Sequence, residues 1–217
     1  MSDIEPYNPL DKLNLGESVA DALLRAPVGP LEHVADLVGA GVYAIYYTGS
    51  FTAYRRIKSL NDDDRYGQPI YVGKAVPKGG RRGGLGFDAG RGNALRDRLR
   101  QHATSIAQAK NLEVRDFYYR ALTVDDIWIP LGENMLIEKF QPLWNRVVDG
   151  FGNKDPGNRR ATQYRSSWDV LHPGRAFVKK LAENPLPEAV IRIRIRAFFA
   201  GKLSEKEKLA PGQEGAD

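Results

Sequence analysis

Apolar and β-branched residues gather in three runs of the chain that predict strands. Residues 39–48 (GAGVYAIYYT) and residues 69–74 (PIYVGK) are rich in Val, Ile and Tyr, and residues 113–124 form a third such run. These residue types favour extended backbone. The polar stretch 50–68 and the seven glycines between residues 79 and 92 predict long loops on either side of the second strand.

Helical spacing of apolar positions predicts two helices in the central part of the chain. Residues 94–110 carry apolar side chains at intervals that place them on one helical face: Leu95, Leu99, Ile106 and Ala109. Residues 130–140 begin with a proline, which fits the first turn of a helix, and Pro142 ends the pattern.

Shorter helices are expected towards both ends of the chain. Residues 17–26 predict a helix that stops before a proline. Residues 191–196 alternate Ile and Arg, which is formally a strand pattern. However, Pro187 and Glu188 form a helix start signal and Gly201 a stop signal, so we favour a helix there.

The order strand, strand, helix, strand, helix predicts the fold class. We expect an α+β protein in which a small antiparallel sheet of about three core strands is flanked by helices. Four regions are expected along the chain. They are an N-terminal arm (1–38), a core (39–147), a loop-rich C-terminal extension suited to recognition (148–201) and a flexible tail (202–217).

Composition narrows the class of protein. With 217 residues and 42% hydrophobic residues, the chain can bury a sizeable core. No apolar run approaches the roughly 20 residues that a membrane span needs, and the polar N-terminus carries no secretory signal pattern. Because there are no cysteines, disulfides and thiolate metal sites are excluded. Nothing indicates export, so we expect a cytoplasmic location.

Positive charge is concentrated in one stretch. The chain has a net charge of +5, and residues 74–102 alone contain eight basic and two acidic residues. Such a segment is typical of a protein with a polyanionic partner. A solvated basic surface would give the same pattern, so charge alone leaves both interpretations open.

Several common site motifs are absent. Residues 67–74 (GQPIYVGK) resemble a phosphate-binding P-loop, but they contain one spacer residue too many, and Ala75 stands where a Ser or Thr would bind magnesium. The three histidines, His33, His102 and His172, lie far apart without zinc-binding spacing. These functions are therefore not predicted.

The helix at 94–110 carries Arg98 and His102 four residues apart, on the same face as its apolar positions. A guanidinium beside an apolar stripe is costly unless it finds an anion, and a phosphodiester is one candidate. Alternatively, Arg98 reaches solvent along the surface and His102 is a core histidine.

Two tyrosines and a lysine lie on the first two predicted strands. If these strands are antiparallel neighbours, Tyr43 and Tyr71 can meet at one site, although strand tyrosines usually serve packing. Lys74, at the end of its strand, could equally be a surface lysine.

An acid and an amide lie on and after the next helix. Glu133 could hold a hard divalent cation if it faces the sheet, or it could simply favour the helix N-terminus. Asn145 is either a turn residue or a residue that orients the site.

These residues, in this order, resemble the GIY-YIG nuclease superfamily. The resemblance spans residues 39–147, with GVY and YVG in place of GIY and YIG. The residues that carry the resemblance are Gly41-Val42-Tyr43, Tyr71-Val72-Gly73, Arg98, His102, Glu133 and Asn145. Longer segments, GAGVYAIYYTG, PIYVGKAVP, PLWNRVVDGFGN and SSWDVLHPGR, resemble the type II restriction endonucleases of this superfamily that cut CCGCGG.

The resemblance implies a Mg²⁺-dependent hydrolysis of phosphodiester bonds in double-stranded DNA. One magnesium ion per active site would be held by Glu133. Tyr43 would be the general base, with Lys74 as the cation that lowers its pKa of about 10. Arg98 would stabilise charge on the scissile phosphate, and His102 would bind the phosphate or donate a proton. Tyr71 would hydrogen-bond to phosphate or water, and Asn145 would orient the site.

A palindromic target implies a homodimer on DNA and functional pairing with a DNA methyltransferase. The residues expected to contact DNA lie in two basic loops: Lys78, Arg81, Arg82 and Arg91 in the first, and Arg159, Arg160, Gln163, Arg165 and Arg175 in the second. Two alternatives remain open. One is a homing or repair nuclease of the same superfamily, and the other is a nucleic-acid-binding module without catalysis.

Overall fold

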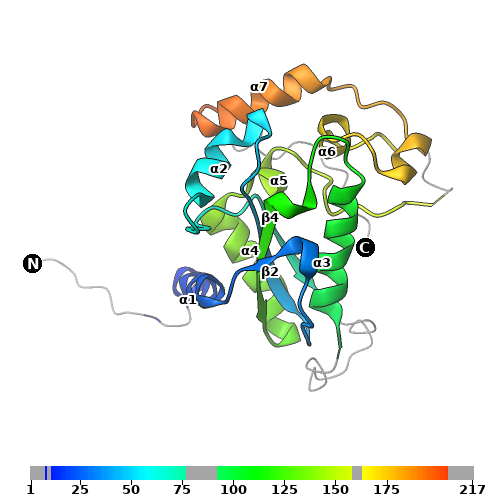
Figure 1. The fold of residues 1–217 in the computed structure, drawn as a ribbon. Coiled ribbons are helices and arrows are strands. Elements are labelled where there is room, and N and C mark those ends of the chain that lie inside the picture. The colour runs from blue at the N-terminus through cyan, green and yellow to red at the C-terminus, as the bar shows by residue number, and fades with distance from the viewer. Residues whose placement is uncertain (1–7, 9–10, 77–91, 158–162, 205–217) are drawn as a thin grey trace, which may run out of the picture.

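The computed structural model describes residue 8 and residues 11–76, 92–157 and 163–204. Its centre is an antiparallel sheet of four strands in the order β1–β4–β2–β3 (Figure 1). The strands are β1 (Gly29–Pro30), β2 (Gly41–Tyr47), β3 (Tyr71–Ala75) and β4 (Phe117–Thr123). The α+β prediction is confirmed: the three core strands are β2, β3 and β4, and the two-residue β1 adds a fourth.

The central strand β2 is buried along its whole length, and its alternating side chains supply both faces of the sheet. On one face, Val42, Ala44 and Tyr46 pack beneath α1 (Lys12–Arg25) and α4 (Ile129–Phe140). β3 is an edge strand whose outer side no other strand covers within the described residues. Side chains from both faces can therefore meet around β3.

The second face of the sheet carries Tyr43, Ile45 and Tyr47. It is covered by α3 (Ala94–Ala107) and by a group of shorter elements (Figure 1). These are α2 (Arg55–Asn61), α5 (Leu143–Arg146), α6 (Ser167–Leu171) and α7 (Glu188–Phe199). Five 3₁₀ turns complete the described elements: Leu31–His33, Thr52–Tyr54, Val114–Asp116, Asp126–Trp128 and Ala176–Lys180.

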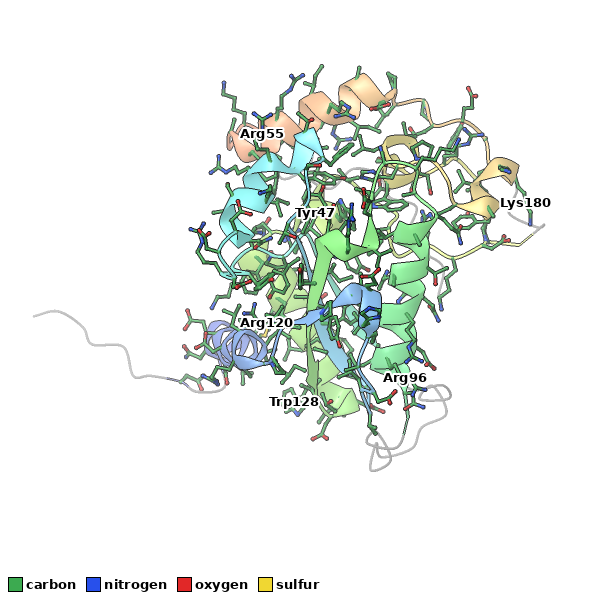
Figure 2. All side chains as sticks on the ribbon, in the orientation of Figure 1. Tyr47, Arg55, Arg96, Arg120, Trp128 and Lys180 are labelled. Carbon is green, nitrogen blue, oxygen red and sulfur yellow. The ribbon has the colours of Figure 1, made fainter. Side chains whose placement is uncertain are left out.

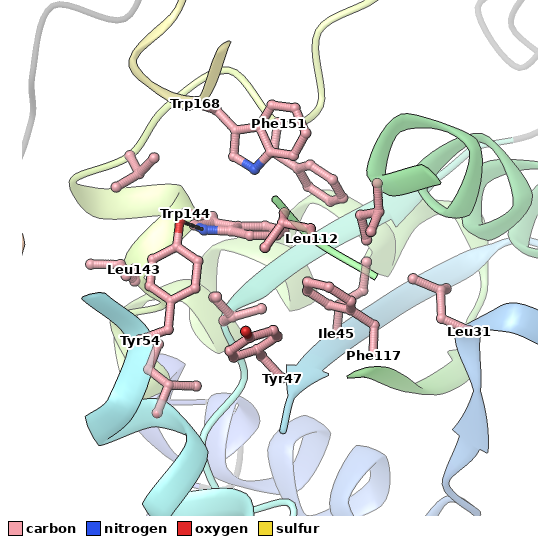
Figure 3. Packing of buried hydrophobic residues seen from close by; sticks show 14 of the residues in the cluster. Leu31, Ile45, Tyr47, Tyr54, Leu112, Phe117, Leu143, Trp144, Phe151 and Trp168 are labelled. Atoms are coloured by element: carbon pink, nitrogen blue, oxygen red, sulfur yellow. Dashed lines mark hydrogen bonds between the residues drawn. The ribbon is translucent and has the colours of Figure 1, made fainter. Parts of the chain in front are cut away.

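Aromatic rings dominate the core on this second face. The ring of Trp144 packs against Phe151 and Trp168 on one side and Tyr54 on the other (Figure 3). The indole nitrogen of Trp144 donates to the hydroxyl of Tyr54 at 2.9 Å. Phe151 extends this cluster to the edge of the candidate site described below, so the core and the site share one packed aromatic layer.

A directional hydrogen-bond chain continues from Tyr54. The Tyr54 hydroxyl lies 2.5 Å from Nε2 of His172, and Nδ1 of His172 lies 2.8 Å from the side-chain oxygen of Asn111. The amide nitrogen of Asn111 donates to the carbonyl of Leu171, so its oxygen is left to accept from the histidine. Burial lowers the pKa of His172 to about 3, so the imidazole is neutral and accepts the Tyr54 proton.

Helix α1 begins earlier than the predicted helix 17–26. Gly16, which weakens helical propensity, lies inside α1 because a side chain there would come within 3.2 Å of Met135 on α4. The glycine thus permits close packing of α1 on α4.

The prediction of a continuous loop at 50–68 is wrong, since α2 lies within it. Its seven residues bury only Ile57 and Asn61, too few positions for a visible helical period. Asn61 ends the element by donating to the carbonyls of Tyr47 and Gln68 at 3.1 and 2.9 Å.

The prediction of a helix around residues 191–196 is confirmed by α7. Ile191 and Ile195, four residues apart, are buried, whereas Ile193 is 54% exposed. The helical period therefore decides which isoleucines enter the core.

Charged side chains cover the outside of these layers, including Arg96 on α3 and Lys180 near its other end (Figure 2). In the described part of the chain, no helix combines the length and apolarity needed to cross a bilayer. The predicted division into four regions stays a prediction. Helix α1, from the first region, adds side chains to the core on one face of the sheet, and α7, from the third region, adds side chains to the core on the other face.

Candidate active site

The buried face of β2 brings Tyr43 against α3. Its hydroxyl lies 2.6 Å from Nε2 of His102. Tyr43 is fully buried and His102 is 2% exposed. The imidazole is also stacked on the ring of Phe151, with centroids 4.5 Å apart. In the structure Nε2 of His102 faces Tyr43, and the expectation that His102 binds the phosphate or donates a proton stays a prediction.

Burial decides the protonation of this pair. It lowers the pKa of His102 well below its usual value, and the positive charge of Arg98 lowers it further. Burial also raises the pKa of Tyr43 well above 10, with Tyr71 adding to the rise and Arg98 opposing it. A neutral imidazole therefore lies beside a protonated hydroxyl, and Nε2 can accept the Tyr43 proton.

The two tripeptides GVY and YVG meet across the β2–β3 ladder. Tyr43 lies opposite Gly73 in the register, and the rings of Tyr43 and Tyr71 are 6.3 Å apart. A side chain at residue 73 would collide with the Tyr43 hydroxyl and come within 2.9 Å of the Tyr71 ring. Glycine is required there because the two tyrosines close over the strand. Tyr71 remains partly exposed.

Arg98 lies one helical turn before His102, as its spacing predicts. Its guanidinium donates to the carbonyl of Gly152 at 3.0 Å and to the side-chain oxygen of Gln101 at 3.2 Å. Its positive charge lowers the pKa of both Tyr43 and Tyr71, against the effect of burial. No carboxylate pairs with Arg98 among the residues that the structure describes, so the guanidinium is available to an anion.

Glu133 and Lys74 approach from the opposite face of the sheet, at the edge strand β3. The lysine Nζ lies 2.9 Å from a carboxylate oxygen of Glu133. The negative charge of Glu133 raises the pKa of both Tyr43 and Tyr71, although less than burial does, so its carboxylate acts on the same site. The prediction that Lys74 tunes Tyr43 is not supported by the structure, in which Lys74 pairs with Glu133 and Arg98 is the cation that acts on Tyr43.

The acids and histidines of the described residues form no group of three or more that could hold a metal ion. Glu133 is thus a lone carboxylate, with a side chain 17% exposed. A single carboxylate fits Mg²⁺, which usually keeps several water ligands and binds substrate phosphate oxygens. The same donor would not fit Zn²⁺, which takes several nitrogen or sulfur ligands.

Asn145 holds the outer edge of β3. Its side-chain oxygen accepts from the amide of Val72, and its side-chain nitrogen donates to the carbonyl of Val72, both at 2.8 Å. The outer side of an edge strand presents backbone N–H and C=O groups that no neighbouring strand pairs. Asn145 pairs both of these groups of Val72, the residue between Tyr71 and Gly73. Asn145 therefore positions the strand that carries Tyr71.

A cavity of about 310 Å³ opens beside this cluster. Arg98, His102 and Lys154 contribute to its lining, together with Phe151 and Gly152. Neither Phe151 nor Gly152 was predicted from the sequence as a site residue. The Gly-Phe-Gly pattern at 150–152 was the available signal, since it allows a close approach of backbone to a site.

Most residues expected to contact DNA lie outside the described residues: Lys78, Arg81, Arg82, Arg91, Arg159 and Arg160. Gln163 and Arg165 are described and partly exposed. The amide of Arg165 donates to the carbonyl of Ala182 at 2.9 Å, which ties this segment to the chain before α7.

The prediction that Arg175 contacts DNA is wrong. It is 2% exposed and forms a buried ion pair with Asp169 at 2.7 Å. The loop-rich composition around it suggested an exposed arginine, but the segment folds back onto the core and buries the guanidinium.

A family model described as the Eco29kI GIY-YIG domain matches residues 35–199. This match covers every element from β2 to α7, including all the site residues described above. A search of curated proteins gave no match.

Proposed function

Because the chain belongs to the Eco29kI GIY-YIG domain family, a restriction endonuclease family, we propose that it makes double-strand cuts at a G/C-only palindrome such as CCGCGG. We further propose that it uses one magnesium ion and a tyrosine general base. Membership of the family itself supports a type II restriction endonuclease that acts on DNA.

One observation carries the proposed chemistry: the buried hydrogen bond of 2.6 Å between Tyr43 and His102. As a water oxygen forms its bond to phosphorus, a water proton passes to the Tyr43 oxygen, and the Tyr43 proton passes to Nε2 of His102. The phosphorus–oxygen bond to the leaving sugar oxygen breaks, and that oxygen takes a proton from solvent. Tyr43 thereby acts as a base without first becoming a buried phenolate.

Glu133 is the proposed magnesium ligand. When bound there, the ion supplies positive charge that stabilises the charge developing on the phosphate. The Glu133 carboxylate raises the pKa of both tyrosines, so neutralising its charge makes their hydroxyls more acidic. Lys74, paired with Glu133, keeps the carboxylate at the edge of β3.

Arg98 is proposed to bind the scissile phosphate. Its guanidinium has neutral hydrogen-bond partners and stands next to the Tyr43–His102 pair. Preset donors directed at developing charge lower a reaction barrier because they need no reorganisation. Tyr71, partly exposed beside them, is proposed to hydrogen-bond to the phosphate or to the attacking water.

A palindromic target presents the same sequence to two subunits related by a two-fold axis. We therefore propose a homodimer on DNA, one active site for each strand. A restriction enzyme of this kind also implies a methyltransferase that protects host DNA, without direct contact, and a cytoplasmic location where that DNA lies.

Digestion of plasmid DNA tests the proposal. Purified protein is incubated with plasmid in magnesium or in EDTA, and the fragment ends are sequenced. Discrete fragments that appear only with magnesium and end within CCGCGG support it. Discrete fragments that end at another sequence would show that the recognition site is not CCGCGG. A smear would indicate a non-specific nuclease, and intact but retarded DNA a binding module without catalysis.

A further inference from the structure

Four consecutive backbone carbonyls, those of residues 150–153, accept hydrogen bonds from two arginines. The guanidinium of Arg175 donates to three of them, those of residues 150, 151 and 153, at 2.9, 3.1 and 3.2 Å. The fourth, the carbonyl of Gly152, accepts from Arg98 at 3.0 Å. The segment 150–153 therefore connects a buried arginine with an arginine of the candidate active site.

All five N–H groups of the Arg175 guanidinium donate hydrogen bonds within the protein. An arginine carries five N–H groups. Two of those of Arg175 donate to the carboxylate of Asp169, each at 2.7 Å, and the other three donate to the carbonyls above. The guanidinium also lies over two aromatic rings, 4.6 Å from the centroid of Trp168 and 4.9 Å from that of Phe177. A fully paired fork of this kind holds a single geometry.

The segment that Arg175 holds lies directly against the candidate site. Phe151 stacks on His102. At Gly152, an added side chain would come within 2.9 Å of the Tyr71 hydroxyl and 3.2 Å of the Arg98 guanidinium. A shift of a few tenths of an ångström in this segment would therefore move the groups that define the site.

We propose that Arg175, together with Asp169, is a positioning residue for DNA cleavage. By fixing the segment 150–153, it holds the Gly152 carbonyl that orients Arg98 towards the phosphate. This inference rests on the proposed nuclease function. It replaces the contact with DNA that the sequence suggested, because Arg175 has no donor left for a base or a phosphate.

A double-mutant cycle with Arg98 tests this role. Arg175→Lys keeps the charge but loses the planar fork. We expect its single-turnover cleavage rate on a saturating cognate duplex to fall about tenfold or more, with duplex affinity unchanged. In the Arg98→Lys background, the same substitution should cost less than about twofold, because Arg175 acts through Arg98.

Val178→Ala is the matched control, because Val178 is buried near Arg175 but its side chain is not part of the carbonyl network. It should lower the unfolding temperature and leave the saturated cleavage rate unchanged. If Arg175→Lys does not fold, Asp169→Asn tests the same fork, since it keeps the side-chain shape and removes the paired charge.

Two results would overturn the inference. One is a wild-type cleavage rate in a folded Arg175→Lys or Asp169→Asn protein. The other is a loss of equal factor in the wild-type and Arg98→Lys backgrounds, which would indicate a purely structural ion pair. Failure of the proposed function itself looks different, because the wild-type protein would then not cut the duplex at all.

Discussion

The hydroxyl of Tyr43 lies 2.6 Å from Nε2 of His102, and both side chains are almost completely buried. The hydrogen bond joins the central strand of the sheet to the helix that also carries Arg98. Because burial keeps the imidazole neutral, the histidine can take a proton that the tyrosine gives up. We therefore propose that the pair moves a proton away from an attacking water.

Glu133→Gln should abolish cleavage in magnesium and leave duplex affinity unchanged. The substitution removes the Glu133 carboxylate but keeps the size of the side chain. Glu138→Gln on the same helix is the control, because Glu138 is exposed and pairs with Arg146, and no effect of its charge on Tyr43 or Tyr71 is resolved. Cleavage assays and binding titrations on one duplex separate the two effects. Near-normal cutting by Glu133→Gln would remove Glu133 from the metal site.

The two buried histidines should make stability depend on pH. The pKa of His172 is about 3 and that of His102 is well below its usual value. As pH falls, each histidine therefore becomes protonated in the unfolded chain at a higher pH than in the folded protein. The free energy of unfolding should therefore fall as pH drops below about 6.5, by up to about 1.4 kcal/mol per pH unit for each histidine.

Denaturant titrations between about pH 6.5 and pH 5 measure this slope, in a range where carboxylates stay mostly ionised. His172→Gln should reduce the slope, since one of the two buried imidazoles is removed. His33→Gln, at an exposed position, leaves both in place and should keep it. An unchanged slope in His172→Gln would contradict this account of the buried Tyr54–His172 pair.

Asn145→Ala should slow cleavage more than it weakens binding. The substitution frees the outward amide and carbonyl of Val72, so β3 can shift and carry Tyr71 with it. We expect the single-turnover rate to fall by about tenfold, the effect of misplacing a group at the site. Asn134→Ala, at an exposed position of α4, should cut normally. A loss of affinity without a loss of rate would instead give Asn145 a direct contact with DNA.

Sequence specificity should reside in the arginines on either side of Gln163. Losing one bidentate guanine contact should cost about 1–3 kcal/mol and relax discrimination at one base pair. Losing a phosphate contact should weaken binding to all sequences alike and reduce its salt dependence. Alanine variants of Arg159, Arg160 and Arg165 are compared on the cognate duplex and on single-base variants. If each variant lost affinity equally for all of these duplexes, the residues that read bases would instead be sought in the loop at 79–92.

The sequence predicted the part of the site that depends on short-range periodicity. Arg98 and His102 share a helix face because they are four residues apart. Tyr43 and Gly73 meet because two short strands pair in register. Both relationships follow from the spacing of residues within or between adjacent elements.

The partners of individual side chains could not be predicted in the same way. Lys74 lies one residue beyond Gly73, and the alternation of the strand turns it towards Glu133 rather than Tyr43. Arg175 is buried because Asp169 on a five-residue helix reaches it across a turn. Such contacts depend on how an irregular segment folds back, which no period in the sequence encodes.

The most direct test of the proposed chemistry compares tyrosine variants in single-turnover cleavage of one cognate duplex. Tyr43→Phe should reduce the rate by about 10²–10⁴-fold, the usual loss for a general base, with affinity unchanged. Tyr46→Phe is the matched control, since Tyr46 lies on the opposite face of the same strand and is equally buried, and it should cut normally. A wild-type rate for Tyr43→Phe, together with an inactive Tyr71→Phe, would contradict the account and assign the base to Tyr71.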